Sequence, residues 1–304
     1  MNDRSEIELS GVAGTSLPHE SAHLHVSGEA VYVDDIPELS GTLYAALGLS
    51  ERAHARVVAM DLSAVRALPG VVDVLLATDI PGKNNCGPIL KDDPILADGT
   101  VQYIGQPLFA VIAESYDAAR RAARMASVEY TDLAPVLSPL TARQQNSFVI
   151  PAMQRSRGDA AAALAQASHR LKGNFQVGGQ EQFYLEGQIS YAVPRENDGM
   201  HLWCSTQHPS EMQHLVAHAL HVSSNQVTVE IRRMGGGFGG KESQSALFAC
   251  VAAVAAKRLQ RPVKLRLDRD DDMMITGKRH DFQFEYEAGF DDEGLIKALK
   301  IELL

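Results

Sequence analysis

Apolar and polar positions divide the chain into two stretches that mix strands and helices. In the first stretch, short apolar or alternating segments predict strands, and the Ala/Arg-rich segment at 116–126 has the spacing of an amphipathic helix. A short helix is predicted at 63–70, where Pro69 and Gly70 close it. The predicted strands are 29–35, 42–50, 56–62, 71–79, 105–115 and 127–133. Residues 19–132 are therefore expected to form a compact α+β domain.

Residues 133–158 are rich in proline and polar residues, which predicts a connector to a second unit. Strands and helices then alternate again, and Pro209 is suited to begin one of the helices. The predicted helices are 159–167 and 209–220, and the predicted strands are 169–177, 187–195, 201–207, 227–233 and 261–267, followed by a hairpin over 282–304. No further element follows that hairpin, so residues 159–304 are expected to be the first part of a second, truncated α+β domain. Residues 1–18 are polar and are expected to form a tail.

Composition and charge narrow the possible functions. The 304 residues carry a net charge of −10, which repels the phosphate backbone, so no nucleic-acid partner is expected. Cys86, Cys204 and Cys250 lie far apart without a C-x-x-C pair, which argues against an iron–sulfur cluster or zinc ribbon in this chain and fits a reducing compartment. The start of the chain has no apolar signal core, and the apolar run at 246–256 is too short to span a membrane. A soluble cytoplasmic protein is expected.

The sequence GGGFGGKE at 235–242 lies between a predicted strand and a predicted helix. It formally satisfies the dinucleotide fingerprint G-x-G-x-x-G, but the strand before it ends in charged residues, unlike a central parallel strand. It also begins like a phosphate-binding loop, yet Glu242 stands where that loop needs Ser or Thr for Mg²⁺. A third interpretation is that bare backbone N–H groups beside Phe238 bind a large rigid ligand at the helix start. The structural alternative is a tight turn that lets helix and strand pack closely.

Several segments of the sequence, in order, resemble one enzyme family. They include SGEAVYVDDIP at 27–37, GQPLFAVIAE at 105–114, STQHP at 205–209, RMGGGFGGKE at 233–242 and RPVKLRLDRDDDMMITGKRH at 261–280. Together they resemble the molybdenum-binding subunit of the xanthine oxidase/aldehyde oxidase family, in its xanthine dehydrogenase branch. The resemblance covers residues 17–304 and implies a hammerhead-type α/β domain at 19–132 and the start of a mixed α+β molybdopterin-binding domain at 159–304.

The resemblance also implies an oxidoreductase reaction, the molybdenum-dependent hydroxylation of a purine such as hypoxanthine or xanthine to urate. It implies that iron–sulfur clusters and FAD lie on a partner subunit, in agreement with the sparse cysteines here. Most pterin contacts, a substrate-contacting arginine and the catalytic base are implied to lie beyond residue 304, in a missing C-terminal part of the subunit. The alternatives are a non-catalytic assembly or binding module that keeps the fold and, more distantly, a Rossmann NAD-binding enzyme.

Particular positions match the residues that form the site in this family. Gln207 matches the glutamine whose amide hydrogen-bonds an oxygen ligand of molybdenum. Phe238 matches the loop aromatic whose backbone N–H approaches the molybdenum ligands, flanked by Gly237 and Gly239. Glu242 matches the glutamate that contacts the purine and assists proton movement on its ring, and in aldehyde-oxidising relatives this position is typically not Glu. The resemblance therefore implies a purine rather than an aldehyde as substrate.

Each of these residues also has a simpler interpretation from local sequence. Gln207 could cap the helix predicted to begin near Pro209. Glu242 could complement the dipole of the helix that follows it. Glu186 lies in a segment that resembles the family, and we expect it to support the site from behind the contacting residues.

Two further clusters have weaker functional interpretations. His214, His218 and His221 share a helical face with zinc-binding spacing, but the Glu of H-E-x-x-H is missing, so an exposed histidine face is favoured. The aspartates of 268–272 lack the spacing and glycine of an EF-hand, so a helix N-terminus or a solvated face is favoured over a cation site.

Overall fold

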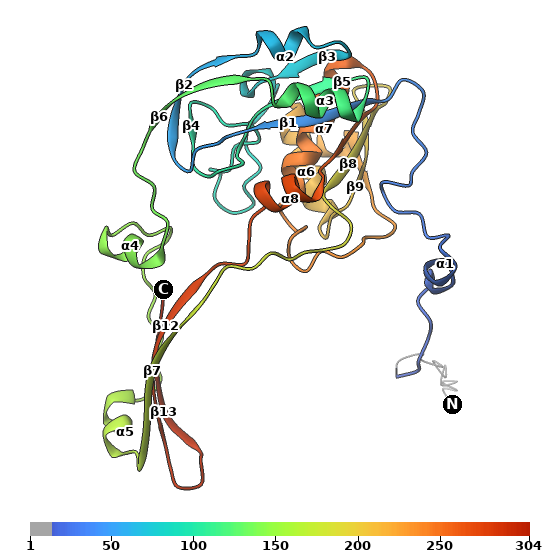
Figure 1. Cartoon of the computed structure of the whole chain (residues 1–304). Helices are drawn as coiled ribbons and strands as arrows, with labels where there is room; N and C mark the ends of the chain where they lie inside the picture. The colour runs from blue at the N-terminus through green and yellow to red at the C-terminus, as the bar shows by residue number, and fades with distance from the viewer. Residues whose placement is uncertain (1–13) are drawn as a thin grey trace, which may run out of the picture.

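The computed structural model describes residues 14–304, so the predicted polar tail at 1–18 lies largely outside the described residues (Figure 1). Its main element is a seven-stranded mixed sheet in the order β10-β9-β8-β11-β1-β5-β3. The strands are β1 (Leu43–Leu49), β3 (Val71–Leu75), β5 (Pro107–Ala113), β8 (Ile189–Pro194), β9 (Met200–Cys204), β10 (Val227–Glu230) and β11 (Val263–Arg266). Strands from both predicted units share this sheet, since β1 pairs in parallel with β11 and antiparallel with β5.

Helices cover both faces of the sheet, which explains why central strands such as β1 and β5 carry apolar residues at successive positions. In β1, Ala45 and Leu47 belong to the core under α6 and α7, whereas Ala46 belongs to the core under α3. Successive side chains of a strand point to opposite faces, so a strand covered on both sides loses its polar–apolar alternation. The covering helices are α3 (Tyr116–Ala123), α6 (Pro209–Leu220) and α7 (Ser245–Leu259).

Helix α7 is buried along most of its length. Every residue from Ser245 to Ala256 is buried, as expected of a helix that is apolar on all sides. Truncating a large side chain such as Phe248 to alanine would cost about 3–5 kcal/mol. The glycine-rich segment therefore ends at a helix that is held in the core.

A second, smaller sheet lies beside the first and has the order β4-β2-β6. Short helices and turns connect the strands of the N-terminal half. The strands of this sheet are β2 (Ala55–Asp61), β4 (Thr100–Val101) and β6 (Ser127–Asp132). The short helices are α2 (Ser63–Ala67) and η1 (Ala77–Asp79). Another short helix, η2 (Ser224–Gln226), precedes β10 in the second half of the chain.

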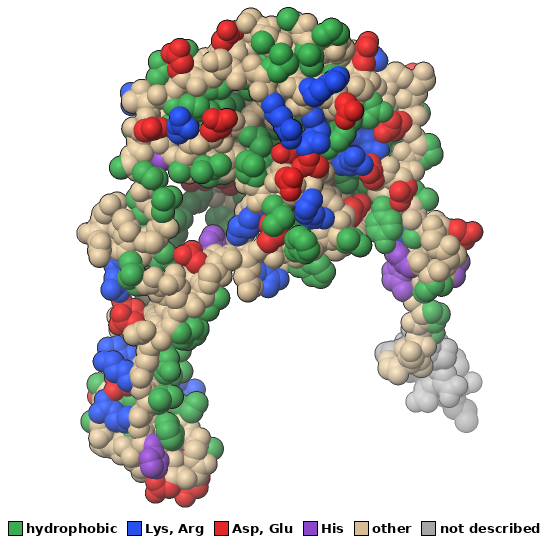
Figure 2. All heavy atoms as spheres, viewed as in Figure 1, with side chains coloured by type: hydrophobic (Ala, Val, Ile, Leu, Met, Phe, Trp, Pro, Cys, Tyr) green, Lys and Arg blue, Asp and Glu red, His purple; other side chains and the backbone are tan. Residues whose placement is uncertain are grey.

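A three-stranded arm extends from the body of the molecule (Figure 1). It consists of β7 (His169–Val177), β12 (Phe282–Phe290) and β13 (Ile296–Leu303), with α5 (Ala160–Gln166) packed over its charged face near Gly289. Phe284 pairs with Phe175 on one side and Leu303 on the other, so these side chains share the opposite, apolar face. Figure 2 shows hydrophobic side chains gathered along one side of the arm.

The elements agree with the sequence prediction in most places and differ in some. The α+β class, the helix at 209–220 and the terminal hairpin are confirmed. The strand predicted at 29–35 is wrong, because a turn forms in which the Asp35 carboxylate accepts from the backbone N–H of Tyr32. The prediction missed α1 (Ala22–Ser27) and α4 (Pro139–Gln144) within the connector. A helix, α8 (Arg269–Ile275), does begin at the aspartate run of 268–272, as one of the two interpretations of that run predicts. The division into units at 19–132 and 159–304 stays a prediction, since one sheet runs through both stretches.

Candidate functional site

The glycine-rich loop connects β10, at the edge of the main sheet, to α7 in its core. Its glycines allow close approach of neighbouring side chains. A Cβ on Gly237 would lie 2.4 Å from Gln207 Oε1, and a Cβ on Gly235 would lie 2.5 Å from Glu186 Cβ. Gly239 has a φ of +90°, which L-residues rarely adopt. The same topology makes the Rossmann interpretation wrong, because antiparallel β8 and also β9 lie between β10 and β11.

The side-chain amide oxygen of Gln207 holds this residue against the loop. Oε1 accepts hydrogen bonds from the backbone N–H groups of Gly239 (3.0 Å) and Lys241 (3.2 Å), and the Gln207 backbone N–H donates to the Lys241 carbonyl (2.7 Å). Both partners of the side chain are donors, so the amide NH₂ must point the other way, and it has no partner among the described residues. The capping alternative is not supported, since His208 Nδ1 accepts from the Glu211 N–H and caps α6 instead.

The tip of the loop presents unpaired donors beside an exposed ring. Within the described part of the chain, the backbone N–H groups of Gly236, Gly237 and Phe238 make no hydrogen bond. The Phe238 side chain is 63% exposed and its φ is +53°, a conformation that is costly for a non-glycine residue. Arg279 holds this conformation by donating to the Phe238 carbonyl (3.2 Å). The tip therefore keeps three backbone N–H donors without a partner in the described chain.

Glu242 follows the loop but stands apart from these donors. Its side chain is exposed and makes no hydrogen bond or ion pair within residues 14–304. It precedes α7, whose first turn begins at Ser245 and contains no acidic residue, so the helix-dipole alternative is not supported. The carboxylate is free to meet a ligand.

Lys241 lies beneath the loop with its side chain fully buried. Its Nζ donates to the Glu186 carbonyl (2.7 Å) and to Ser205 Oγ (2.7 Å), and lies 4.6 Å from the centre of the Tyr184 ring. Burial lowers the pKa of Lys241, while the Glu186 carboxylate opposes that shift. The phosphate-loop interpretation is not supported, because that role needs the lysine amine to face a ligand.

Sequence reasoning missed the buried partner of Tyr184. Asp272 accepts from the Tyr184 hydroxyl (2.6 Å) and from the Gln188 N–H (2.8 Å), and only 1% of it is exposed. Burial and this hydrogen bond raise the pKa of Tyr184, so the phenol stays protonated and donates. Asp268 caps α8, as the helix-terminus interpretation predicts. One buried member of an aspartate run has no signal in sequence alone.

Two hollows, of roughly 550 and 430 Å³, border Gly239 and the segment 231–234 that leads into the glycine loop. The larger is lined by Gly239, Gln182 and Arg279 among others, and the smaller by Gln207 and Arg232 among others. The structure thus brings Gln207, Gly237, Phe238 and Gly239 together, whereas Glu242 lines neither hollow.

Comparison with known proteins shows what this arrangement belongs to. Residues 27–134 match the a/b hammerhead domain of aldehyde oxidase and xanthine dehydrogenase, and residues 141–304 match the molybdopterin cofactor-binding domain. The chain belongs to the xanthine oxidase/aldehyde oxidase family.

Relatives in both branches of this oxidoreductase family are similar to the chain. The xanthine dehydrogenase of Drosophila subobscura is 44% identical over 287 residues, which are 93% of this chain and 21% of that protein. Aldehyde oxidase 2 of Rattus norvegicus is 42% identical over 296 residues, which are 97% of this chain and 22% of that protein. Quinoline 2-oxidoreductase from Pseudomonas putida 86 has a TM-score of 0.85 at 26% identity, covering 95% of this chain and 39% of that one. The chain spans about a fifth of the length of the curated relatives.

A molybdenum cofactor, which this family carries, fits the residues of the loop. The molybdenum ligands and phosphate of such a cofactor are hydrogen-bond acceptors, and the Gln207 amide and the unpaired N–H groups of the loop tip are donors. Among residues 14–304, no group of three or more His, Cys, Asp or Glu side chains is placed to hold a metal ion. His214 instead contacts Ser224 Oγ (3.1 Å) through Nδ1. The donor set suits a metal that brings its own ligands.

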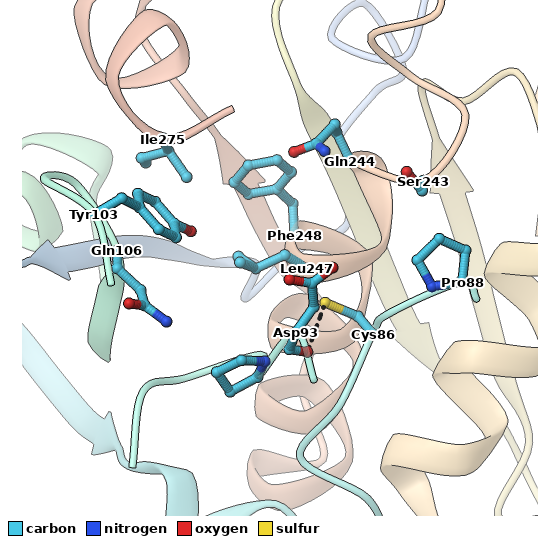
Figure 3. Close-up of a pocket in the computed structure, with 11 residues that line it drawn as sticks. Cys86, Pro88, Asp93, Tyr103, Gln106, Ser243, Gln244, Leu247, Phe248 and Ile275 are labelled. Carbon is cyan, nitrogen blue, oxygen red and sulfur yellow. Dashed lines mark hydrogen bonds between the residues drawn. The ribbon is translucent and has the colours of Figure 1, made fainter. Parts of the chain in front are cut away.

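A cavity of about 50 Å³ joins the N-terminal half to the start of α7 (Figure 3). Phe248 and Gln244 line it from the α7 side, and Tyr103 and Cys86 line it from the other half. Cys86 Sγ donates to the Asp93 carbonyl (3.5 Å), and burial raises the pKa of the thiol to about 12, so it stays neutral. The residues that line this small cavity pack the N-terminal half against the start of α7.

Proposed function

We propose that the chain forms one wall of the molybdenum cofactor site of an enzyme that hydroxylates purines, such as hypoxanthine and xanthine to urate. The observation that carries this proposal is the Gln207 amide, whose oxygen is fixed by the loop and whose nitrogen is free. A neutral donor orients an oxygen ligand without adding charge. Gly237 and Phe238 would hold the same group through their unpaired backbone N–H donors, and Gly239, which has no side chain, would allow its close approach.

The residues of this chain would bind and orient, while the cofactor supplies the redox chemistry that accepts two electrons from the substrate carbon. Glu242 would hold the purine and move a proton at a ring nitrogen, since its carboxylate has no competing partner in the described chain. An aldehyde has no ring N–H for this carboxylate to bind. Glu242 therefore supports a purine substrate over an aldehyde.

The remaining components would lie outside this chain. The rest of the molybdenum subunit would supply the other wall, and a partner subunit would carry the iron–sulfur clusters and FAD, in a cytoplasmic enzyme. The exposed apolar face of the arm supports contact with the rest of the molybdenum subunit, because Phe175, Ile301 and Leu303 are each at least half exposed. Residues 14–304 contain no helix of the length and apolarity that a membrane span requires.

The test compares purine and aldehyde turnover in the enzyme that contains this chain. Molybdenum and pterin content are measured first, followed by oxidation of xanthine and of a simple aldehyde. Glu242→Gln is expected to lower kcat/KM for xanthine about 100-fold or more and to affect the aldehyde far less. The exposed Glu129→Gln serves as the control. Equal loss with both substrates, or absence of molybdenum, would contradict the proposal.

A further inference from the structure

We infer that Lys241, Glu186 and Ser205 form a positioning device that fixes the direction of the Gln207 amide. The inference concerns the shape of the loop itself, and its link to a molybdenum cofactor rests on the function proposed above. None of the three side chains presents a donor to the hollow beside Gln207, since each is directed to the others beneath the loop.

The device ties three segments to one buried point. Glu186 Oε2 accepts from Ser205 Oγ (2.7 Å), from the Gly235 backbone N–H (2.8 Å) and from Lys241 Nζ (3.4 Å). The Glu186 backbone N–H also donates to the Gly235 carbonyl (3.1 Å). The strand-connecting segment before β8, the end of β9 and both ends of the glycine loop are therefore held together.

The backbone of Lys241 transmits this position to Gln207. Its N–H donates to Gln207 Oε1 and its carbonyl accepts from the Gln207 N–H. Thr206 Oγ1 (3.0 Å) and Ser245 Oγ (3.1 Å) donate to the same carbonyl. The buried Lys241 side chain fixes this backbone, so a change at Nζ reaches the amide that faces the ligand.

The use of a charged group for this purpose needs an explanation beyond packing. A buried ammonium is costly unless it is paired, and an apolar residue of similar volume would stabilise the fold as well or better. An apolar side chain, however, could not bind Ser205, the Glu186 carbonyl and the carboxylate at once. The three donors of one lysine specify the relative position of three segments.

Residue-level hydrogen exchange on the cofactor-free chain tests the inference, because it needs no bound ligand. The Ser205→Ala variant removes the central hydroxyl. Its matched control is Ser190→Ala, a buried serine of β8 whose hydroxyl makes one hydrogen bond among residues 14–304, to Cys204 Sγ. Ser205→Ala is expected to speed exchange at the Gly235, Gly239 and Lys241 amides about 10-fold, with Ser190→Ala unchanged there. Unchanged exchange at these amides in Ser205→Ala would overturn the inference.

A second variant separates positioning from stability. Lys241→Met removes the cation beside the mostly buried Glu186 carboxylate, whereas Lys241→Met with Glu186→Gln removes both members of the pair and should recover most of the lost Tm. Exchange at Gly239 is expected to stay about 10-fold fast in the double variant. If exchange returns to the wild-type rate together with Tm, the pair is only structural and the inference fails.

The holoenzyme provides an independent readout. Ser205→Ala enzyme is expected to retain less molybdenum and pterin than Ser190→Ala enzyme, in proportion to the loss of amide protection. Equal cofactor retention despite faster exchange would overturn the link to the cofactor. Wild-type enzyme without molybdenum would instead contradict the proposed function, while the exchange result would still decide the positioning role.

Discussion

Gln207 shows how a neutral side chain acquires a single orientation. The oxygen of its amide meets two N–H donors, so the nitrogen has only one direction left. The nearby glycines make room for this orientation, because a Cβ on Gly237 would lie only 2.4 Å from the Gln207 amide oxygen. At this scale the candidate site consists of glycines that leave space and of Gln207, whose side chain fills that space.

Replacing Gln207 by glutamate tests this orientation with almost no change in size. One carboxylate oxygen would still accept from Gly239 and Lys241, but the other would present a negative charge where the wild type presents a donor. We expect kcat/KM to fall about 100-fold or more, with reduced molybdenum content and a Tm within a few degrees of wild type. Gln145→Glu, on the exposed end of α4, makes the same charge change away from the site. Activity equal to that of this control would contradict the role of Gln207.

At the scale of elements, the arm places most of its apolar residues on one face and most of its charges on the other. Apolar residues of β7, β12 and β13 lie in register on one face, where the Phe175 and Phe284 rings stack 4.4 Å apart. The opposite face carries charges such as Arg170 and Glu287, which are ion-paired, and it packs against α5. Two open edges beside an uncovered apolar face are the surface expected of an interaction site.

Placing a charge on the apolar face tests this view of the arm. Ile301→Lys in the isolated chain is expected to reduce self-association and binding of an apolar dye several-fold, because it interrupts the exposed patch. Glu285→Lys adds positive charge to the other face of β12 and is the control. Sedimentation and dye fluorescence provide the measurements. Equal behaviour of the two variants would show that the patch does not drive association.

At the scale of the whole molecule, an ion-pair cluster ties the N-terminal segment to the main sheet. Lys264 of β11 is buried and pairs with Asp34 (2.9 Å) and Glu38 (3.0 Å), and Arg266 pairs with Asp34 (2.7 Å). Burial would raise the pKa of Asp34, but hydrogen bonds and charge from Lys264 and Arg266 outweigh it and lower that pKa. For Glu38, burial is likewise outweighed by hydrogen bonds from Tyr44 and Lys264, and the pKa is lowered.

The direction of these shifts predicts how stability depends on pH. A carboxylate whose pKa is lower in the folded state stabilises it fully above its unfolded pKa, about 4 to 4.5, and this contribution is lost as pH falls through the folded value. Asp34→Asn with Glu38→Gln should therefore lose about 2 kcal/mol at pH 7, less than for a fully buried pair because both carboxylates are partly exposed.

The same double variant should show a weaker decline in stability below pH 4 than the wild type. Denaturant unfolding at several pH values measures both effects. The control for charge removal is the double variant Asp98→Asn with Glu51→Gln, which changes two exposed carboxylates outside the cluster. Parallel pH profiles for the wild type and the Asp34/Glu38 variant would contradict the role of the cluster.

The sequence by itself determined the local elements and the family of this protein. Periodicity predicted α6 and the β12–β13 hairpin, because their apolar spacing and turn residues act over a few positions. The motif around Gly237 and Phe238 predicted the site segment, and the segment STQHP predicted Gln207 as part of it. The strand predicted at 29–35 is wrong because the Asp35 carboxylate accepts a hydrogen bond from the Tyr32 N–H, and this local bond favours a turn over an extended strand.

Only the tertiary structure decided how these pieces meet. The pairing of β1 with β11 joins residues more than two hundred positions apart, and no local pattern encodes it. The buried roles of Lys241 and Asp272 depend on which side chains surround them, since the same residues would be solvated on a surface. Sequence identified a loop rich in backbone donors, and tertiary contacts with Glu186 and Gln207 decided how that loop is held and which side-chain amide oxygen its N–H groups meet.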